Sequence, residues 1–399
     1  MKQGWEVKKL GEICDFQNGF AFKSKTYKED GKPILRITNI QNQLLEINDL
    51  VYFHENDYKE NFDRFKVYKD DLVIAMSGAT TGKLGINKSD IVFYLNQRVG
   101  KFIPKENLSK TYLYYFLSTK VEESLRIAAG AAQPNLSTEQ INNFEIPLSP
   151  LQEQQRIVAI LDEAFTAIDK AKANIEQNLK NAKELFESEL QRIFSEKGDG
   201  WEEKRLEEVV DENCNLSYGI VQPGDEFPDG LPVIRPTDLT QKLITTKGLK
   251  LIDPKLSEAY KRTLLKGGEL LICVRGNTGV VSVATNELKG ANVTRGIVPI
   301  VFNSELIFQD FGYYLLISSY FQKQIKEKTY GAALMQINIG DLRKVHSKYP
   351  SLKKQIEIVS KLDTLHEQTK KLEAVYAQKL QDLEELKKSV LQKAFSGEL

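Results

Sequence analysis

The chain has 399 residues, of which 41% are hydrophobic and 28% charged, enough for two or three globular domains of ordinary soluble composition. Its 55 Lys and Arg balance 55 Asp and Glu, and this zero net charge does not favour a protein that grips nucleic acid alone. No apolar run approaches the ~20 residues of a membrane helix, and the start lacks a signal-peptide core. We therefore expect a cytoplasmic protein.

The cysteines and histidines are few and scattered. Cys14, Cys214 and Cys273 lie far apart, and no pair of Cys or His has the spacing of metal ligands. We therefore expect no metal site and no disulfide framework, and we interpret the cysteines as buried or bystander residues.

The N-terminal part combines short strands with a helix. Apolar runs predict strands at 34–38, 72–76 and 98–103, followed by a helix at 112–128. Two early loops interleave basic and aromatic residues, FQNGFAFKSKTYK at 16–28 and YKENFDRFKVYK at 58–69. Such loops suit contacts with phosphates and bases, although a solvated surface loop explains the spacing equally well.

One turn in this part resembles a phosphate-binding loop. SGATTGK at 77–83 follows an apolar strand, but its glycines enclose three residues instead of four, and Leu84 follows Lys83 where Ser or Thr would hold magnesium. A glycine-bearing turn required by the fold is the better interpretation. The turn can still contact a ligand, because loops carry function.

Residues 151–197 contain no Gly or Pro and have apolar residues at helical spacing, so we predict one long helix. The apolar seam advances in steps of three and four, as in a coiled coil. A seam this narrow requires a partner helix. Its principal residues are Leu161, Ile168, Ile175, Leu179 and Leu185.

The partner helix is a second copy of the first. Residues 352–396 match 151–195 without a gap, so LQEQQRIV is answered by LKKQIEIV and LQRIFS by LQKAFS. One inserted residue would rotate the seam by about 100°, so both the length and the facing of these helices are functional. The second seam contains Leu362, Leu365, Leu372, Leu380 and Leu383.

The globular parts repeat as well, with loops of different length. GWEVKKLGEICD from Gly4 is answered by GWEEKRLEEVVD from Gly200, and DLVIAMSGATTG from Asp71 by ELLICVRGNTGV from Glu269. We predict an α+β protein with an internal repeat. Its expected parts are a first domain at 1–150, a long helix at 151–199, a second domain at 200–350 and a second long helix at 351–399.

With the duplicated LxEQxxIV helix start, the terminal LQKAFSGEL and the early GFAFKSKTY in view, the chain resembles the specificity subunit of type I restriction-modification systems. The resemblance covers essentially the whole chain. It implies two target-recognition domains, each reading one half of a split site in double-stranded DNA. It also implies that the two helices pack antiparallel, form a pseudo-two-fold repeat and set the distance between the domains.

The resemblance also implies partners. Two adenine-N6 methyltransferase subunits and a motor-nuclease restriction subunit would join the chain, and S-adenosylmethionine, ATP and magnesium would bind to those partners. This chain would bind no cofactor and no membrane, and it would not be an enzyme. The sequence itself contains no credible catalytic set.

Polar and basic residues in the loops and turns are the candidate DNA contacts. In the first domain they are Asn18, Lys23, Ser24, Tyr27, Arg36, Ser77, Thr80 and Lys83. In the second domain they are Ser217, Tyr218, Arg235, Arg262, Arg275, Asn277 and Thr278.

Two alternatives remain on the sequence alone. The chain could be a protein-only scaffold, in which two binding modules on a coiled coil recruit protein partners without DNA. It could also be an enzyme with a cryptic site, which binding of S-adenosylmethionine by the isolated chain would reveal.

Overall fold

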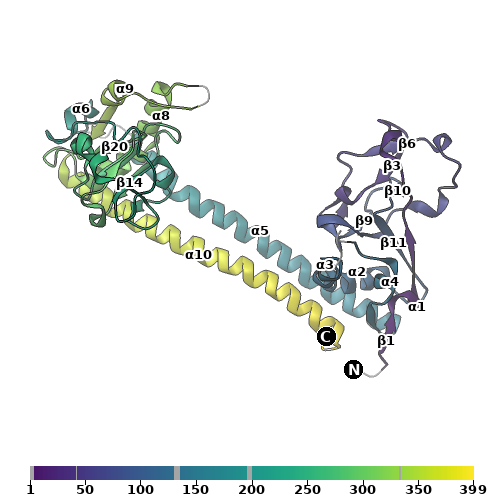
Figure 1. Cartoon of the computed structure of the whole chain (residues 1–399). Coiled ribbons are helices and arrows are strands. Elements are labelled where there is room, and N and C mark those ends of the chain that lie inside the picture. The colour runs from purple at the N-terminus through teal and green to yellow at the C-terminus, as the bar shows by residue number, and fades with distance from the viewer. Residues whose placement is uncertain (1–3, 42, 130–134, 196–199, 332–333) are drawn as a thin grey trace. The chain divides into compact units, whose positions relative to one another are not determined.

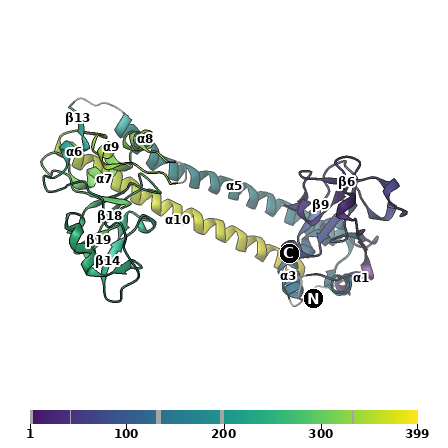
Figure 2. The ribbon, with the colours of Figure 1, turned by 45° about the horizontal axis from the view of Figure 1, so that its top comes forward.

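The computed structural model describes residues 4–41, 43–129, 135–195, 200–331 and 334–399. The chain divides into two compact units. Unit 1 is Met1–Ile175 with Gln378–Leu399, and unit 2 is Glu176–Ala377. Each unit contains part of both long helices, which run without a break in the ribbons of Figures 1 and 2.

Unit 1 contains two main sheets and one separate strand pair. The larger sheet has the order β2-β11-β8-β9-β5-β4, the smaller β6-β3-β10-β7, and β1 pairs with β12. The strands are β1 Glu6–Lys9, β2 Cys14–Asn18, β3 Lys32–Leu35, β4 Ile40–Gln41, β5 Leu44–Leu45, β6 Val51–Phe53, β7 Lys66–Val67, β8 Leu72–Ala75, β9 Leu84–Ile86, β10 Phe93–Leu95, β11 Val99–Pro104 and β12 Glu145–Leu148.

The helices of unit 1 differ in one respect from the prediction. The helix expected at 112–128 is two helices, because α2 ends at Thr119 and α3 begins at Val121. The hydroxyls of Ser118 and Thr119 donate to carbonyls of the preceding turn, which weakens continuation of the helix. The α-helices are α1 Leu10–Ile13, α2 Lys110–Thr119, α3 Val121–Ala129, α4 Thr138–Asn142 and α5 Leu151–Ser195.

The central strand β8 is buried on both faces, which explains its continuous apolar run. Leu72 and Ile74 face the core that contains α2 and the long helices, whereas Val73 and Ala75 face a second core under the smaller sheet. The strand predicted at 34–38 ends early, at Leu35, because the Asn39 side chain accepts the N–H of Arg36 and starts a short 3-10 turn.

Unit 2 repeats this plan with fewer strands. Its sheets have the orders β16-β14-β19 and β15-β18-β17-β20, and β13 pairs with β21. The strands are β13 Glu202–Arg205, β14 Leu231–Ile234, β15 Leu243–Ile244, β16 Lys250–Ile252, β17 Leu270–Cys273, β18 Val281–Ala284, β19 Asn292–Val293, β20 Ile297–Ile300 and β21 His346–Tyr349. The α-helices are α6 Leu206–Val209, α7 Gln309–Ile317, α8 Ser319–Lys328, α9 Ile339–Arg343 and α10 Leu352–Ser396.

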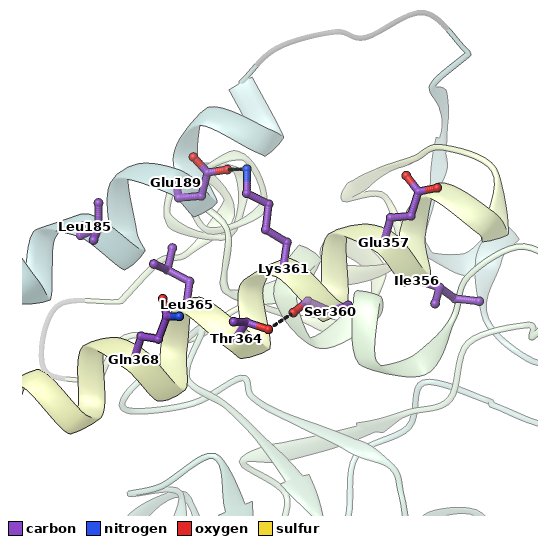
Figure 3. A pocket seen from close by; sticks show the side chains of 9 residues that line it. All are labelled: Leu185, Glu189, Ile356, Glu357, Ser360, Lys361, Thr364, Leu365 and Gln368. Atoms are coloured by element: carbon purple, nitrogen blue, oxygen red, sulfur yellow. Dashed lines mark hydrogen bonds and ion pairs between the residues drawn. The ribbon is translucent and has the colours of Figure 1, made fainter.

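The two long helices run antiparallel within each unit. In unit 1 the Nζ of Lys172 lies 2.8 Å from a carboxylate oxygen of Glu384, and further along Lys387 meets Asp169 at 4.0 Å. In unit 2 Lys361 meets Glu189 at 2.6 Å (Figure 3). Residue numbers fall along one helix as they rise along the other, which confirms the predicted antiparallel pair.

The structure corrects two residues of the predicted seam. Leu185 is 51% exposed and Leu372 is 41% exposed. The seam instead continues through Phe186, whose ring lies 5.2 Å from that of His366, and through the buried Thr369. The buried Ala182 also belongs to the seam, which reaches Phe186 by a step of four where the prediction had a step of three to Leu185.

The other predicted seam residues differ in burial. Leu161, Ile168 and Leu362 are buried, and five more are half-buried. Those five are Ile175, Leu179, Leu365, Leu380 and Leu383.

A fully buried glutamine ties the first turn of each long helix to its globular part. The side-chain oxygen of Gln154 accepts the N–H of Ser109 at 2.9 Å, and its amide donates to the carbonyls of Asn107 and Ser149 at 2.9 and 2.7 Å. Gln355 makes the same three bonds with Phe308, Leu306 and Pro350 in unit 2. These residues are the Gln of the duplicated LxEQxxIV and LKKQIEIV segments, so the motif encodes the junction.

We predict that Gln154→Leu destabilises unit 1 by about 2 kcal/mol, because the buried carbonyl of Ser149 and the less buried N–H of Ser109 and carbonyl of Asn107 lose their side-chain partner. Thermal unfolding followed by circular dichroism should show a lower midpoint. The neighbouring exposed residue gives the control, Gln155→Leu, which should change the midpoint little. An equal loss in both variants would contradict the role of the buried amide.

An ion-pair cluster joins the long helices in unit 2. Hydrogen bonds from Arg192, and then from Lys361, lower the pKa of Glu189 to about 2. The side chain of Glu189 is 16% exposed, whereas both cations are at least half exposed. Its carboxylate therefore stabilises the folded chain at neutral pH, and this contribution is lost as the pH falls below about 4.5 toward 2.

We expect Glu189→Gln to lower the free energy of unfolding by about 1–2 kcal/mol at pH 7, since its partners are partly screened by water. The difference from wild type should shrink as the pH is lowered from 5 to 3, and urea unfolding at each pH measures it. Glu187→Gln, at an exposed carboxylate of the same helix, is the matched control. A pH-independent difference would refute this assignment.

Candidate functional site

In unit 1 the ends of separate chain segments meet at one edge of the sheets. The N–H of Phe20 donates to Leu95, that of Asn96 to Leu35, and that of Met76 to Arg98, at 2.8 to 3.0 Å. Leu136 in turn donates to Met76 at 2.7 Å. We name this edge rim 1 and define it as residues 19–20, 36, 77–80, 96–98 and 135.

Unit 2 builds the same edge from the equivalent segments. Ile220 donates to Val293, Thr294 to Ile234, Val274 to Gly296 and Ile337 to Val274, at 2.8 to 3.0 Å. We name this edge rim 2 and define it as residues 218–220, 235, 275–278, 294–296 and 336. The repeat therefore preserves this edge even though the loops around it differ in length.

Three buried polar atoms without hydrogen-bond partners among the described residues belong to the two rims, and others belong to Ser149, Tyr320 and Ser347 elsewhere in the fold. Among the described residues, the Nε of Arg36 and the Oγ of Ser77 in rim 1, and the Nε of Arg275 in rim 2, are buried and make no hydrogen bond. Such atoms are rare in folded proteins because each forfeits its bonds to water. Ser77 and Arg275 hold equivalent places, since each follows the matched strand of its unit and forms an isolated β-bridge with a later segment, at Asn135 and at Gln336. Both rims therefore present unused hydrogen-bonding capacity.

The structure brings several of the predicted site residues of unit 1 together. Arg36, Ser77 and Thr80 lie in rim 1, and Tyr27 adjoins it through a 3.5 Å bond from the amide of Asn96. The others lie beside the rim or in its approaches. Asn18 exchanges hydrogen bonds with Thr138 at the start of α4, exposed Lys23 and Ser24 lie in the loop after β2, and exposed Lys83 ends the turn before β9.

The predicted residues of unit 2 fall in two places. Tyr218, Arg235, Arg275, Asn277 and Thr278 belong to rim 2. Ser217 and Arg262 instead line a separate polar cavity of about 330 Å³ beside Glu269.

The aromatic residues of the early loops form a core. Phe22, Phe62 and Phe65 are at most 6% exposed and pack with Phe53 at ring distances such as 4.6 and 4.7 Å. The interleaving of basic and aromatic residues in the two loops thus places the phenylalanine rings inward and leaves the lysines outside. For these buried phenylalanines the structure contradicts the interpretation as base-stacking contacts.

The glycine-bearing turns support the fold. Gly78 and Gly82 have φ of +76° and +83°, and Gly276 and Gly279 have +88° and +94°, values that side chains disfavour. The hydroxyl of Thr81 donates to the carbonyl of Gly78 at 2.7 Å, which closes the first turn on itself. A tight turn used twice therefore explains the motif without a bound nucleotide.

Two arginines of the rims, Arg98 and Arg295, are not among the DNA contacts predicted from the sequence. Arg98 is exposed at the turn between β10 and β11, and no ion pair of its side chain exists within the described residues. The guanidinium carbon of Arg295 lies 5.9 Å from the ring centre of Tyr218. The sequence feature that could have identified them is a basic residue between two buried strands, which occurs in both copies of the repeat as NQRVG and VTRGI.

Among the described residues no group of three or more His, Cys, Asp or Glu could hold a metal ion, and no helix is long and apolar enough to cross a membrane. Burial raises the pKa of the Cys14 thiol to about 12 and also raises that of Cys273. These thiols are therefore protonated at neutral pH. The interpretation of both cysteines as core residues agrees with this environment.

A sequence profile described as the type I restriction modification DNA specificity domain matches residues 2–181 and 198–384. The chain belongs to this family. The two matches correspond to the two halves of the internal repeat, so the family assignment and the duplicated rims describe the same organisation.

Some relatives match essentially the whole chain, and others match about half of it. The specificity subunit of the type I restriction enzyme EcoBI from Escherichia coli is 26% identical, with 99% of this chain and 86% of the relative covered. The StySPI specificity subunit from Salmonella potsdam is 24% identical, with coverage of 100% and 90%. The MjaVIII specificity subunit from Methanocaldococcus jannaschii is 31% identical over 46% of this chain and 45% of its own length.

Two solved structures share the fold. A chain from a study of complex assembly and conformational transition of the type I restriction-modification system has a TM-score of 0.78 at 20% identity, with 100% of this chain and 99% of that chain covered. The HsdS subunit from Thermoanaerobacter tengcongensis has a TM-score of 0.65 at 19% identity, with 100% and 98% covered. The predicted α+β fold with an internal repeat and coiled-coil helices is thereby confirmed.

We predict that Ser77→Ala leaves the stability of the free chain unchanged or slightly raised, because it removes a buried hydroxyl that makes no hydrogen bond. Thr81→Ala in the same turn removes a bonded hydroxyl and should cost about 1 kcal/mol. Thermal unfolding of the two variants compares them directly. A larger loss for Ser77→Ala than for Thr81→Ala would show that Ser77 has an internal structural role.

Proposed function

We propose that the chain is the DNA-recognition subunit of a type I restriction-modification complex and that each unit reads one half of a split target site with its rim. The duplicated rim, with unbonded polar groups at equivalent places, is the observation that carries this proposal. Arg, Ser, Thr and Asn side chains are the donors and acceptors that read base edges and phosphates. Family membership supports the same function.

The zero net charge fits a recognition subunit that works within a complex. Phosphate neutralisation dominates the affinity of proteins that bind DNA alone, and it requires a basic surplus. In the proposed complex two methyltransferase subunits close around the DNA and supply much of that charge, and restriction subunits join them. S-adenosylmethionine, ATP and magnesium then bind to those partners, in the cytoplasm, and this chain contributes specificity without catalysis.

The gapless match of the two long helices supports a role in spacing. Since each inserted residue advances a helix by ~1.5 Å and rotates its seam by ~100°, a helix pair of fixed length suits a split site with a fixed spacer. We propose that the helix pair sets that spacer, whereas the rims set the bases.

The test is to express the chain with its cognate methyltransferase subunit in a host without other adenine methylation and to map N6-methyladenine by single-molecule sequencing. A single split motif should appear, and it should vanish when this chain is omitted. Absence of any split motif in the presence of a stable complex would overturn the proposed function.

Exchange of residues 1–148 for the matching part of a relative should change the bases of one half of the motif only. Unit 1 and unit 2 each have a complete rim, so neither half depends on the other for its contacts. The reciprocal exchange of residues 200–350 is the matched control and should change the other half. A change in both halves after a single exchange would argue against modular recognition.

A further inference from the structure

The two rims contain the same arginine-capped turn with one difference in charge. The N–H of Arg36 donates to the side chain of Asn39 at 3.1 Å, and the N–H of Arg235 donates to that of Asp238 at 2.7 Å. The backbone N–H of Asn39 donates to the carbonyl of Arg36, and that of Asp238 donates to the carbonyl of Arg235, each with an N–O distance of 2.9 Å. The backbone of the turn is therefore conserved between the units, while a neutral amide in one replaces a carboxylate in the other.

In unit 2 the carboxylate of Asp238 forms an ion pair with Arg235. The Nε and Nη2 of Arg235 donate to the two oxygens of Asp238 at 3.1 and 2.9 Å, and the side chain of Asp238 is only 12% exposed. Hydrogen bonds with this carboxylate raise the pKa of Arg235. A two-pronged pair of this kind neutralises the guanidinium and fixes its direction, so few of its donors remain for a ligand.

In unit 1 the corresponding Arg36 has no carboxylate partner in the part of the chain that the structure describes. The amide of Asn39, 2% exposed, donates to the carbonyl of Asn48 at 3.1 Å and offers no charge to Arg36. One Nη of Arg36 donates to the carbonyl of Asp49 at 2.6 Å, while its Nε is buried without a partner. No carboxylate within the described residues forms an ion pair with this guanidinium.

This arrangement is costly unless a ligand completes it. The Arg36 side chain is half-buried, and its buried Nε–H has lost its bond to water without gaining another, which carries a desolvation cost. The Oγ of Ser77 is the other unbonded group of rim 1. The segment of Arg36 and the turn of Ser77 are neighbours, since the side chain of Ile37 approaches Gly78. The N–H donors of a guanidinium form a planar fork, and the DNA acceptors that match it are phosphate oxygens and the O6 and N7 atoms of guanine.

We infer that Arg36 contacts DNA directly in the half-site read by unit 1, whereas Arg235 is a positioning residue that Asp238 withholds from DNA. The residue at position 39 or 238 thus decides whether the arginine of its rim is a contact. This inference rests on the proposed function and adds an asymmetry between the two rims that their common fold does not require.

The test compares Arg36→Gln with the double variant Arg235→Gln/Asp238→Asn, each in the complex with methyltransferase subunits. Both variants carry Gln and a neutral amide in the same turn, so local structure is matched and no carboxylate is left unpaired. DNA affinity is measured against salt on the wild-type site. We expect Arg36→Gln to weaken binding about ten- to a hundredfold and the double variant to stay within about threefold of wild type.

The reciprocal single changes probe the switch itself. Asn39→Asp should capture Arg36 and reproduce the loss of Arg36→Gln, while Asp238→Asn should release Arg235 and change affinity or base preference in the second half-site. The variant Arg36→Lys distinguishes between a guanine base and a phosphate as the group that Arg36 contacts. Retained affinity with relaxed preference at one base indicates guanine, and retained preference and salt dependence indicate a phosphate.

Folding and assembly are checked by thermal unfolding and by the mass of the complex. Wild-type binding by an intact Arg36→Gln complex would overturn the inference, as would an equal loss in the double variant. If the wild-type complex methylates a split site, such a result leaves the proposed function standing. If the wild-type complex methylates no split site, the proposed function itself fails.

Discussion

The junction between globular part and helix is the constraint on which the rest of the structure depends. Gln154 and Gln355 are completely buried, and each satisfies one N–H and two carbonyls where a loop meets the first turn of a long helix. Because three bonds fix the helix start, any change in the seam is transmitted to the globular part as a rotation. The gapless repeat of the helices follows from this rigid attachment, since only whole and matched helices keep both seams facing each other.

A second pair of contacts reinforces each junction two turns further along the helix. The hydroxyl of Tyr115 donates to Asp162 in unit 1, and that of Tyr314 donates to Asp363 at 2.5 Å in unit 2. Burial and the adjacent carboxylate raise the pKa of both tyrosines, so the hydroxyl proton stays in place over the physiological range. Duplicated polar contacts of this kind favour one facing of the helix, whereas apolar packing alone tolerates small rotations.

The sequence was sufficient for the long helices, because forty-five residues with a regular seam and no Gly or Pro leave few alternatives. The sequence was insufficient at Leu185 and Leu372, which are exposed. Steps of three and of four along the helix both reach a residue that the seam can accommodate there, so tertiary packing decides which one is buried. The strands β8 and β11 were found because both are apolar runs, and α2 and α3 were merged because the local competition of Ser118 and Thr119 leaves no break in the apolar pattern.

The rims were only partly visible in the sequence. Arg36, Ser77 and Arg275 stood out as polar residues at strand ends, but the formation of each rim depends on backbone bonds between segments of its own unit that are far apart in the chain. Arg98 and Arg295 gave a weak signal because they lie within turns only a few residues long. Asp238 was invisible as a partner of Arg235, since a carboxylate three residues away is as often solvated as paired.

The division of the chain into units has a consequence for how it is made. Unit 1 combines residues 1–175 with 378–399, and in it the ring of Phe395 lies 5.1 Å from that of Tyr112 while Arg156 donates to the carbonyl of Leu399 at 2.6 Å. During translation the first half of the α5 seam therefore emerges long before its partner in α10. At about 5–20 residues per second, roughly 200 residues separate the two, a delay on the order of 10 to 40 s. Unit 2, continuous in sequence, is synthesised within that interval. The apolar seam of the first half of α5 is thus exposed to solvent while the rest of the chain is translated. It needs protection from other nascent copies, which expose the same seam.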